Sequence, residues 1–141
     1  MYSEKVKKYF ENPINMGIIE NADTIGVIEN KVCSDIIKIY LKIVNGIIID
    51  AKFEAKGCPP VIASCCVITM MIKNINIENA KYITANEIIE DLDGLPDEKI
   101  HCAELVVNTL KNAINNLKQW IYIGNSIKFF KGFSLPSSNF S

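Results

Sequence analysis

The segment over residues 37–54 carries the pattern that most restricts how this chain can fold. Aliphatic residues alternate with lysines and a tyrosine over 37–43 and with charged residues over 47–54, on either side of Asn45-Gly46. A period of two places successive side chains on opposite faces of a strand. Asn-Gly accepts the positive φ angles of a type I′ turn. The pattern therefore predicts a β-hairpin with one aliphatic face that other elements must cover.

The remaining periodic segments predict the elements that complete this domain. A further strand is expected over 24–29, before the hairpin. Helices are expected over 3–12, 61–73, 85–92 and 103–120, with a shorter piece over 76–82. Pro60 fits the first turn of the second helix, and Thr84 with Glu87 forms a capping box. Strands followed by helices predict the α+β class, with a small antiparallel three-stranded sheet and helices packed on one face.

Length and charge exclude several classes of protein. The chain has 141 residues, of which 49% are hydrophobic, so we expect a single domain with a real core. A net charge of -1, with lysines interspersed among acidic residues, argues against nucleic acid as a partner. The chain has no apolar run long enough for a membrane span, and its first residues lack the apolar core of a signal peptide. These features predict a cytoplasmic protein that does not act in a membrane.

The polar residues of interest fall at three breaks between predicted elements. Cys33 and Asp35 lie in the bend between the first two strands, Cys58 lies between the hairpin and a helix, and His101-Cys102 opens the last helix. In a reducing compartment, cysteines indicate metal or redox chemistry more than disulfides. Loop ends that converge at one edge of the sheet would place these residues around a metal centre. The alternative is a set of scattered core cysteines.

The position of Cys102 near a helix N-terminus predicts a lowered thiol pKa, which favours the thiolate that binds metal or attacks sulfur. The alternative is a small buried cysteine beside a surface histidine.

Cys65 and Cys66 allow two interpretations as well: a pair of small helix residues in the core, or extra ligands or a redox pair. We favour the core interpretation for this pair, because apolar contacts suit cysteine well.

Short motifs occur in a fixed order over roughly residues 2–120. They are Tyr2-Ser3-Glu4-Lys5-Val6 with Glu11-Asn12-Pro13, Ala22-Asp23-Thr24-Ile25-Gly26, Cys33-Ser34-Asp35, Gly57-Cys58 followed by Ile62-Ala63-Ser64, and Asp93-Gly94-Leu95-Pro96 leading to Lys99-Ile100-His101-Cys102. In this combination the chain resembles the iron–sulfur cluster assembly scaffold family, the IscU-type proteins also found as the N-terminal domain of NifU. The combination is specific, although each fragment alone is weak.

The resemblance implies a scaffold or carrier protein without turnover of its own. On such proteins a labile [2Fe-2S] cluster is assembled from iron and sulfur and handed to apo iron–sulfur acceptor proteins. The three cluster cysteines of the family match Cys33, Cys58 and Cys102, its aspartate matches Asp35, and its histidine matches His101. The resemblance also implies an iron donor and a cysteine desulfurase, whose persulfide sulfur Cys102 accepts first. Asp35 would make the cluster easier to release.

The chain departs from the family pattern at several positions. Ser34 replaces the usual glycine between the first cysteine and the aspartate, and Pro59-Pro60 replaces the glycine and serine after the second cysteine. Proline pushes the residue before it, here Cys58, toward an extended conformation. Asp97-Glu98 replaces the centre of the family's Leu-Pro-Pro-Val-Lys motif, which leaves docking of an Hsp70-type chaperone open.

The resemblance assigns residues 1–120 to the scaffold domain and leaves 121–141 as a C-terminal tail without an assigned role. It leaves open whether the chain acts as a monomer or a homodimer. Two other functions remain: a zinc-dependent sulfurtransferase that relays persulfide, and a structural zinc-binding interaction domain. Zinc suits the same ligands as iron. The sulfurtransferase branch usually has an insertion before its last cysteine and lacks the adjacent histidine, whereas this chain has His101 and no evident insertion.

Overall fold

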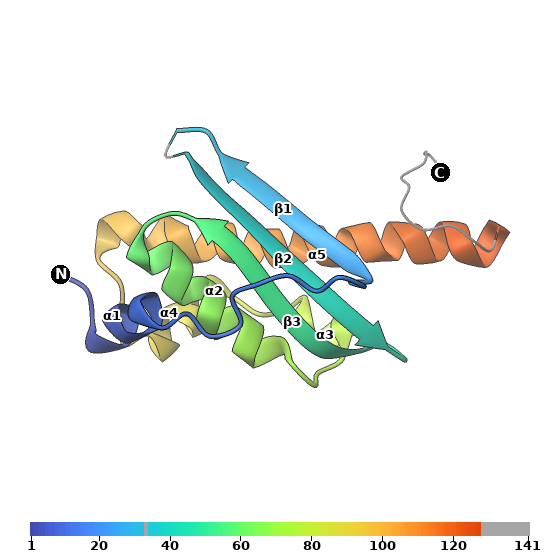
Figure 1. The fold of residues 1–141 in the computed structure, drawn as a ribbon, viewed down its shortest axis with the longest axis horizontal. Coiled ribbons are helices and arrows are strands. Elements are labelled where there is room, and N and C mark those ends of the chain that lie inside the picture. The colour runs from blue at the N-terminus through green and yellow to red at the C-terminus, as the bar shows by residue number, and fades with distance from the viewer. Residues whose placement is uncertain (33, 128–141) are drawn as a thin grey trace.

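The computed structural model describes residues 1–32 and 34–127, and for residues 118–127 it describes the backbone alone. Its sheet consists of β1 (Thr24–Asn30), β2 (Asp35–Val44) and β3 (Ile47–Lys56), antiparallel and in the order β1-β2-β3 (Figure 1). The helices are α1 (Glu4–Glu11), α2 (Pro59–Ile72), α3 (Ile77–Ala80), α4 (Ala85–Asp91) and α5 (Ile100–Ile127), with a 3₁₀ turn over Asp97–Lys99. The predicted α+β class and the three-stranded sheet are confirmed.

The turn between β2 and β3 is the one that the sequence predicts. Asn45 has a φ of 52° and Gly46 a φ of 80°, as a type I′ turn requires at both central positions. From this turn the two strands pair from Val44 with Ile47 to Ile36 with Lys56, with an irregularity between Lys42 and Ile43. The predicted buried face is present at Ile37, Ile39, Leu41, Ala51 and Phe53. Near the turn the prediction is wrong, because the register shift buries Ile48 and leaves Ile49 45% exposed.

That face forms the core together with two helices. In the structure α5 packs against β1 and β2, while α2 packs against β3 and against α5. Most of the largest fully buried side chains come from the strands and from these two helices: Ile37, Ile39, Leu41, Ile48, Phe53, Ile68, Ile72, Leu110 and Ile114. Ile88 and Leu92 at α4 and Val6 of α1 complete this set. The helix α1 lies on α2 and forms a further layer on the same side. Helices on one face of the sheet are thus confirmed.

The middle of α5 lies unusually close to β1, at Gly26. A methyl group on Gly26 would lie 2.6 Å from the backbone nitrogen of Ala113 and would also collide with the carbonyl oxygen of Thr109. The neighbouring Thr24 donates a hydrogen bond from its hydroxyl to the Ala113 carbonyl at 2.7 Å. Only glycine allows the helix backbone to approach the strand this closely.

Two asparagines of α5 add hydrogen bonds to the same strand. The Oδ1 atom of Asn112 accepts a bond from the Val27 N–H at 2.9 Å. The Nδ2 atom of Asn116 donates a bond to the Ile25 carbonyl at 2.9 Å. Together with the close approach at Gly26, these bonds fix where α5 sits along β1; we refer to Thr24, Gly26, Asn112 and Asn116 as the α5–β1 contact.

Helix ends follow the predicted signals. Ser3 caps α1 by accepting from the Val6 N–H, and the capping box of Thr84 and Glu87 is present at the start of α4. The helix α5 is longer than the predicted 103–120: it begins at Ile100 and extends to Ile127. The prediction was too short because it followed only the helical spacing of the apolar residues, and the helix continues beyond them. Residues 128–141 of the predicted tail lie outside the described residues. Within the described part of the chain, no helix is long and apolar enough to span a membrane.

Candidate functional site

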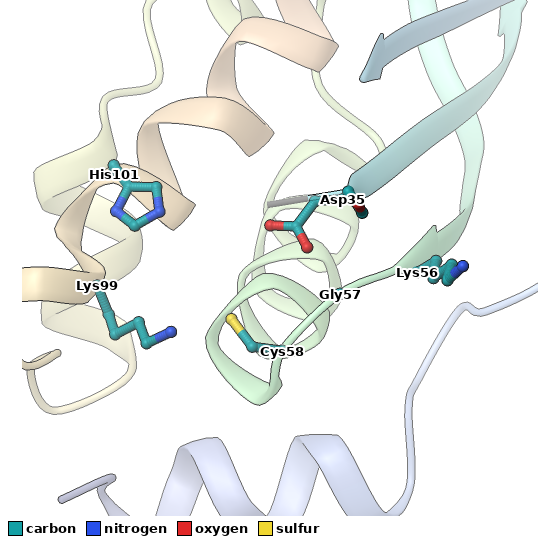
Figure 2. A pocket seen from close by; sticks show the side chains of 7 residues that line it. Asp35, Lys56, Gly57, Cys58, Lys99 and His101 are labelled. Carbon is teal, nitrogen blue, oxygen red and sulfur yellow. The ribbon is translucent and has the colours of Figure 1, made fainter. Parts of the chain in front are cut away.

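Three segments that are far apart in the sequence meet at one end of the sheet. Because β2 begins where the antiparallel β3 ends, the first residue of β2 lies beside the turn into α2, and α5 begins next to both. A cavity of about 450 Å³ opens there (Figure 2). Its lining residues are Ser34, Asp35, Lys56, Gly57, Cys58, Lys99 and His101. Three of the five predicted site residues therefore line one cavity.

Cys58 and Cys102 lie next to each other at this cavity. Their Sγ atoms are 3.7 Å apart and both thiols are free, because a disulfide would need about 2.05 Å. Cys58 occupies the position before the first residue of α2 with φ −76° and ψ 169°, the extended conformation that the following proline favours, and its side chain makes no capping hydrogen bond. Cys58 is half-buried and lines the cavity, whereas Cys102 is fully buried behind it.

His101 and Asp35 flank this pair of thiols. The Nε2 atom of His101 lies 3.8 Å from the Cys102 Sγ atom, and the histidine is exposed. Asp35 is the first residue of β2 and is only 7% exposed. In Figure 2 its carboxylate is directed into the cavity that Cys58 and His101 also line. A thiol, an imidazole and a carboxylate thus line one cavity, and the buried thiol of Cys102 lies beside the first.

The protonation of Cys102 differs from the prediction. The pKa of this thiol is raised from 9.0 to about 12, chiefly by burial and then by the neighbouring Cys58, while Lys99 acts in the opposite direction. The expected lowering by the helix N-terminus is therefore wrong for this state of the protein. Desolvation outweighs the helix terminus because the side chain has no contact with water. Cys102 is a neutral thiol at neutral pH.

Cys33 lies outside the described residues, so its place in the site stays a prediction. Among residues 1–32 and 34–127, no group of three or more histidine, cysteine, aspartate or glutamate side chains is placed to hold a metal ion. The donors that are described still fit iron or zinc in kind, since thiolate, imidazole and carboxylate are the usual ligands of both. Ser34, directly after Cys33, has a φ of 59°, in the left-handed region that favours glycine.

Cys65 and Cys66 lie in the hydrophobic core and are both fully buried. Burial raises the pKa of Cys65 well above its usual value and raises that of Cys66 to about 11. The Cys66 thiol lies 3.9 Å from the Tyr9 carbonyl, on the side of α2 that faces α1. The core interpretation of this pair is confirmed.

Sequence reasoning assigned no role to two residues that line the cavity, Lys56 and Gly57. Lys56 is the last residue of β3, and Gly57 connects it to Cys58. Continued from the two-residue turn, the predicted pairing would place Gly57 opposite Ser34. Asp35 comes opposite Gly57 only through the register shift between Lys42 and Ile43, which no local pattern in the sequence indicates.

Comparison with known proteins adds to this geometry. The family described as NifU-like N terminal domain matches residues 1–122. The iron–sulfur cluster assembly scaffold protein IscU 1 of Archaeoglobus fulgidus is 44% identical over 114 residues, which cover 81% of this chain and 74% of that protein. The scaffold protein IscU of Haemophilus influenzae is 39% identical over 121 residues, 83% of this chain and 95% of that protein.

Solved structures share the fold. A crystal structure from Fervidobacterium islandicum, described as an iron–sulfur cluster assembly scaffold of the SUF system, superposes with a TM-score of 0.69 at 26% identity and covers 80% of this chain and 96% of that one. The family match at residues 1–122 contains every residue that lines the cavity.

Proposed function

The chain belongs to the IscU/NifU N-terminal family of iron–sulfur cluster assembly scaffold proteins, and we propose that it assembles a labile [2Fe-2S] cluster at the Cys58–Cys102 end of the sheet. Scaffold proteins of this family are non-catalytic carriers. One observation carries the location: Cys58 lines a cavity together with Asp35 and His101, and its Sγ atom lies 3.7 Å from that of the buried free thiol Cys102. The cluster is the cargo of the protein, made from iron and sulfur and passed to apo acceptor proteins.

We propose Cys33, Cys58 and Cys102 as thiolate ligands, with Asp35 and His101 completing the ligand set. Cys33 enters this set because it stands two residues before Asp35, whose carboxylate is directed into the cavity. A metal ligand must be deprotonated, so iron binding releases the proton that burial holds on Cys102. A shell with a carboxylate and an imidazole among thiolates holds a cluster less firmly than four thiolates, which suits a carrier that must release it.

Sulfur is proposed to arrive from a cysteine desulfurase as a persulfide. The thiolate of Cys102 attacks the outer sulfur of that persulfide, the S–S bond of the desulfurase breaks, and its own cysteine leaves as a thiolate. Cys58 is the second candidate for this acceptor, because it is half-buried and lines the cavity while Cys102 is fully buried. If Cys102 is the acceptor, the start of α5 must move to expose it.

Two further functions use the same residues. A zinc-dependent sulfurtransferase would hold zinc with the same ligands and relay persulfide, and a structural zinc domain would close the site completely. Zinc binds such ligands more tightly than ferrous iron, so its presence in a preparation does not distinguish these functions. The half-buried Cys58 and the open cavity favour exchange of cargo over a closed structural site.

Partners and location follow from the scaffold function. An iron donor must supply ferrous iron, and a reducing cytoplasm keeps the thiols free for it. An Hsp70-type chaperone would meet the segment over residues 95–99, whose Asp97 and Glu98 are exposed at the start of the 3₁₀ turn. Binding of such a chaperone, and formation of a homodimer, are open to direct measurement.

Anaerobic reconstitution tests the proposed function. The full chain is incubated with ferrous iron, cysteine and a cysteine desulfurase, and visible absorption follows cluster formation and transfer to an apo-ferredoxin. We expect a cluster that forms on the parent chain, is lost in the Cys33→Ser, Cys58→Ser and Cys102→Ser variants, and moves to the acceptor. A chain that forms no cluster but carries persulfide in a zinc-dependent way would instead be a sulfurtransferase. Mass spectrometry of the persulfide decides between Cys102 and Cys58 as the acceptor.

A further inference from the structure

Gly57 lies directly across the sheet from Asp35. The pairing of β2 with β3 ends at Ile36 and Lys56, and the next pair in the same register is Asp35 with Gly57. Both positions fall on the face that carries Ile37 and the core, since side chains alternate along a strand. Opposite residues of antiparallel strands have Cβ atoms about 4.5–5.5 Å apart, so the side chain at one position limits the other.

Asp35 uses the space that a side chain at position 57 would fill. A methyl group on Gly57 would lie 3.1 Å from the Asp35 Oδ1 atom. It would also lie 3.1 Å from the Cβ and Cγ1 atoms of Val61, one turn into α2. Such contacts are tighter than ordinary van der Waals distances, so at least one of the two neighbours must move away.

The two neighbours differ in how easily they can move. Val61 is fully buried and belongs to the core cluster, where a shift disturbs many contacts. The Asp35 carboxylate is the end of a side chain and borders an open cavity. The carboxylate can turn at lower cost than Val61 can shift, so a methyl group at position 57 would move it first.

We propose that Gly57 is a positioning residue for Asp35. Its missing Cβ lets the carboxylate lie across the end of β3, directed into the cavity beside Cys58 (Figure 2). Gly57 touches no cargo atom in this proposal and acts only through Asp35. The inference rests on the proposed function for the role of Asp35 in cluster release, but the geometric link between the two residues can be measured without a cluster.

The test is a double-mutant cycle with Gly57→Ala, Asp35→Ala and the combined variant in the full chain. The apo proteins are titrated with Co²⁺ alone, and the visible absorption of the bound ion and its affinity in competition with a chelator are recorded. Cluster transfer to an apo-ferredoxin is measured in parallel. Gly46→Ala is the matched control, because it adds a methyl group at the other end of the same hairpin, where no atom lies within 4 Å.

We expect Gly57→Ala to change the Co²⁺ spectrum in the same direction as Asp35→Ala and to slow cluster transfer roughly fivefold. A fivefold change corresponds to the size of coupling that is typical of two residues in contact. In the Asp35→Ala background the same change should have no effect on spectrum or transfer. Gly46→Ala should lower stability and leave the spectrum unchanged. A Gly57→Ala effect of equal size in both backgrounds would overturn the proposal, as would a spectrum that Gly57→Ala leaves unaltered while Asp35→Ala changes it.

Two further results distinguish a failure of the positioning role of Gly57 from a failure of the proposed role of Asp35 in cluster release. If both substitutions change the Co²⁺ spectrum non-additively but neither changes cluster transfer, the positioning role stands and the proposed role of Asp35 in release fails. If Gly57→Ala folds poorly, urea unfolding of the combined variant decides. Removal of the Asp35 carboxylate relieves the crowding, so the combined variant should be more stable than Gly57→Ala alone, and an equal or lower stability would contradict the inference.

Discussion

The helix α5 takes part in two contacts of opposite character. In its middle, the α5–β1 contact brings backbone against backbone at Gly26 and adds hydrogen bonds from the asparagine side chains. At its start, Cys102 and His101 adjoin a cavity of about 450 Å³. The difference indicates that one part of the helix fixes its position while the other lies beside an open cavity. Substitutions in the two regions should therefore affect different properties.

The largest expected difference concerns the reactivity of the thiol at the start of α5. With a pKa of about 12 in place of 9.0, Cys102 has about 1,000-fold less thiolate at neutral pH than an unperturbed cysteine. We expect alkylation by iodoacetamide to be slower by at least that factor and to rise tenfold per pH unit between pH 7 and 9. Peptide mass spectrometry of the labelled chain measures the rate.

The same labelling in denaturant serves as the control, since unfolding removes the burial that raises the pKa. The rates of Cys102 in the folded and unfolded chain should then differ widely. Equal rates would show that the start of α5 opens as readily as an unfolded segment, and the contrast between the two contacts would disappear.

Gly26→Ala should break the other contact. The added methyl group collides with the backbone of α5, so we expect a loss of about 3 kcal/mol in the free energy of unfolding, measured with urea. Gly46→Ala provides the comparison, because its cost comes only from a φ of 80° and should be about 1 kcal/mol. A Gly26→Ala variant no less stable than Gly46→Ala would mean that the helix can move away from β1 at little cost.

Asn112→Ala should weaken the same contact more gently. It removes the acceptor of the Val27 N–H, and a typical intramolecular hydrogen bond contributes about 1 kcal/mol. Urea unfolding checks this value, with the exposed Asn115→Ala on the same helix as the control. Because alanine favours helix, the control should be unchanged or slightly more stable. Equal losses in the two variants would assign the effect to the helix rather than to its bond with β1.

Ser34→Gly should raise the stability of the protein at the end of the sheet that carries the cavity. Ser34 has a φ of 59°, where a residue with a side chain costs about 1–2 kcal/mol, and part of the gain on change to glycine is lost to chain entropy. We expect a net gain of about 0.5 kcal/mol in the free energy of unfolding. Asn45→Gly at the other turn, with a φ of 52°, should gain less because asparagine tolerates this conformation. A loss of stability in Ser34→Gly would show that the serine makes a stabilising contact.

Local patterns in the sequence predicted much of the fold. The Asn45-Gly46 turn and the capping box at Thr84 each depend on neighbouring residues, and the structure has both. The alternation holds over 37–41 and over 51–53 but fails beside the turn, where the register shift buries Ile48 in place of Ile49. Antiparallel pairing of the two strands accounts for Asp35 and Cys58 at one end of the sheet, and the structure adds His101 there through the start of α5.

Contacts between distant residues could not be predicted in the same way. The approach of Gly26 to Ala113 depends on how far α5 sinks toward the sheet, which no local pattern encodes. The predicted direction of the Cys102 pKa shift was wrong for a related reason. Its helix position suggested a thiolate, but burial is set by the packing of α2 and α5 and has the larger effect.

The asparagines of α5 also bond to the backbone along the outer edge of β1. An outermost strand usually presents unpaired N–H and C=O groups on which a strand from another molecule can add, the first step of many aggregates. On β1 the Val27 N–H and the Ile25 carbonyl are already bonded to Asn112 and Asn116. A second copy that approaches β1 would have to break these bonds before it could pair. The residues that hold the helix in place thereby also occupy two of the hydrogen-bonding groups on which a further strand would pair.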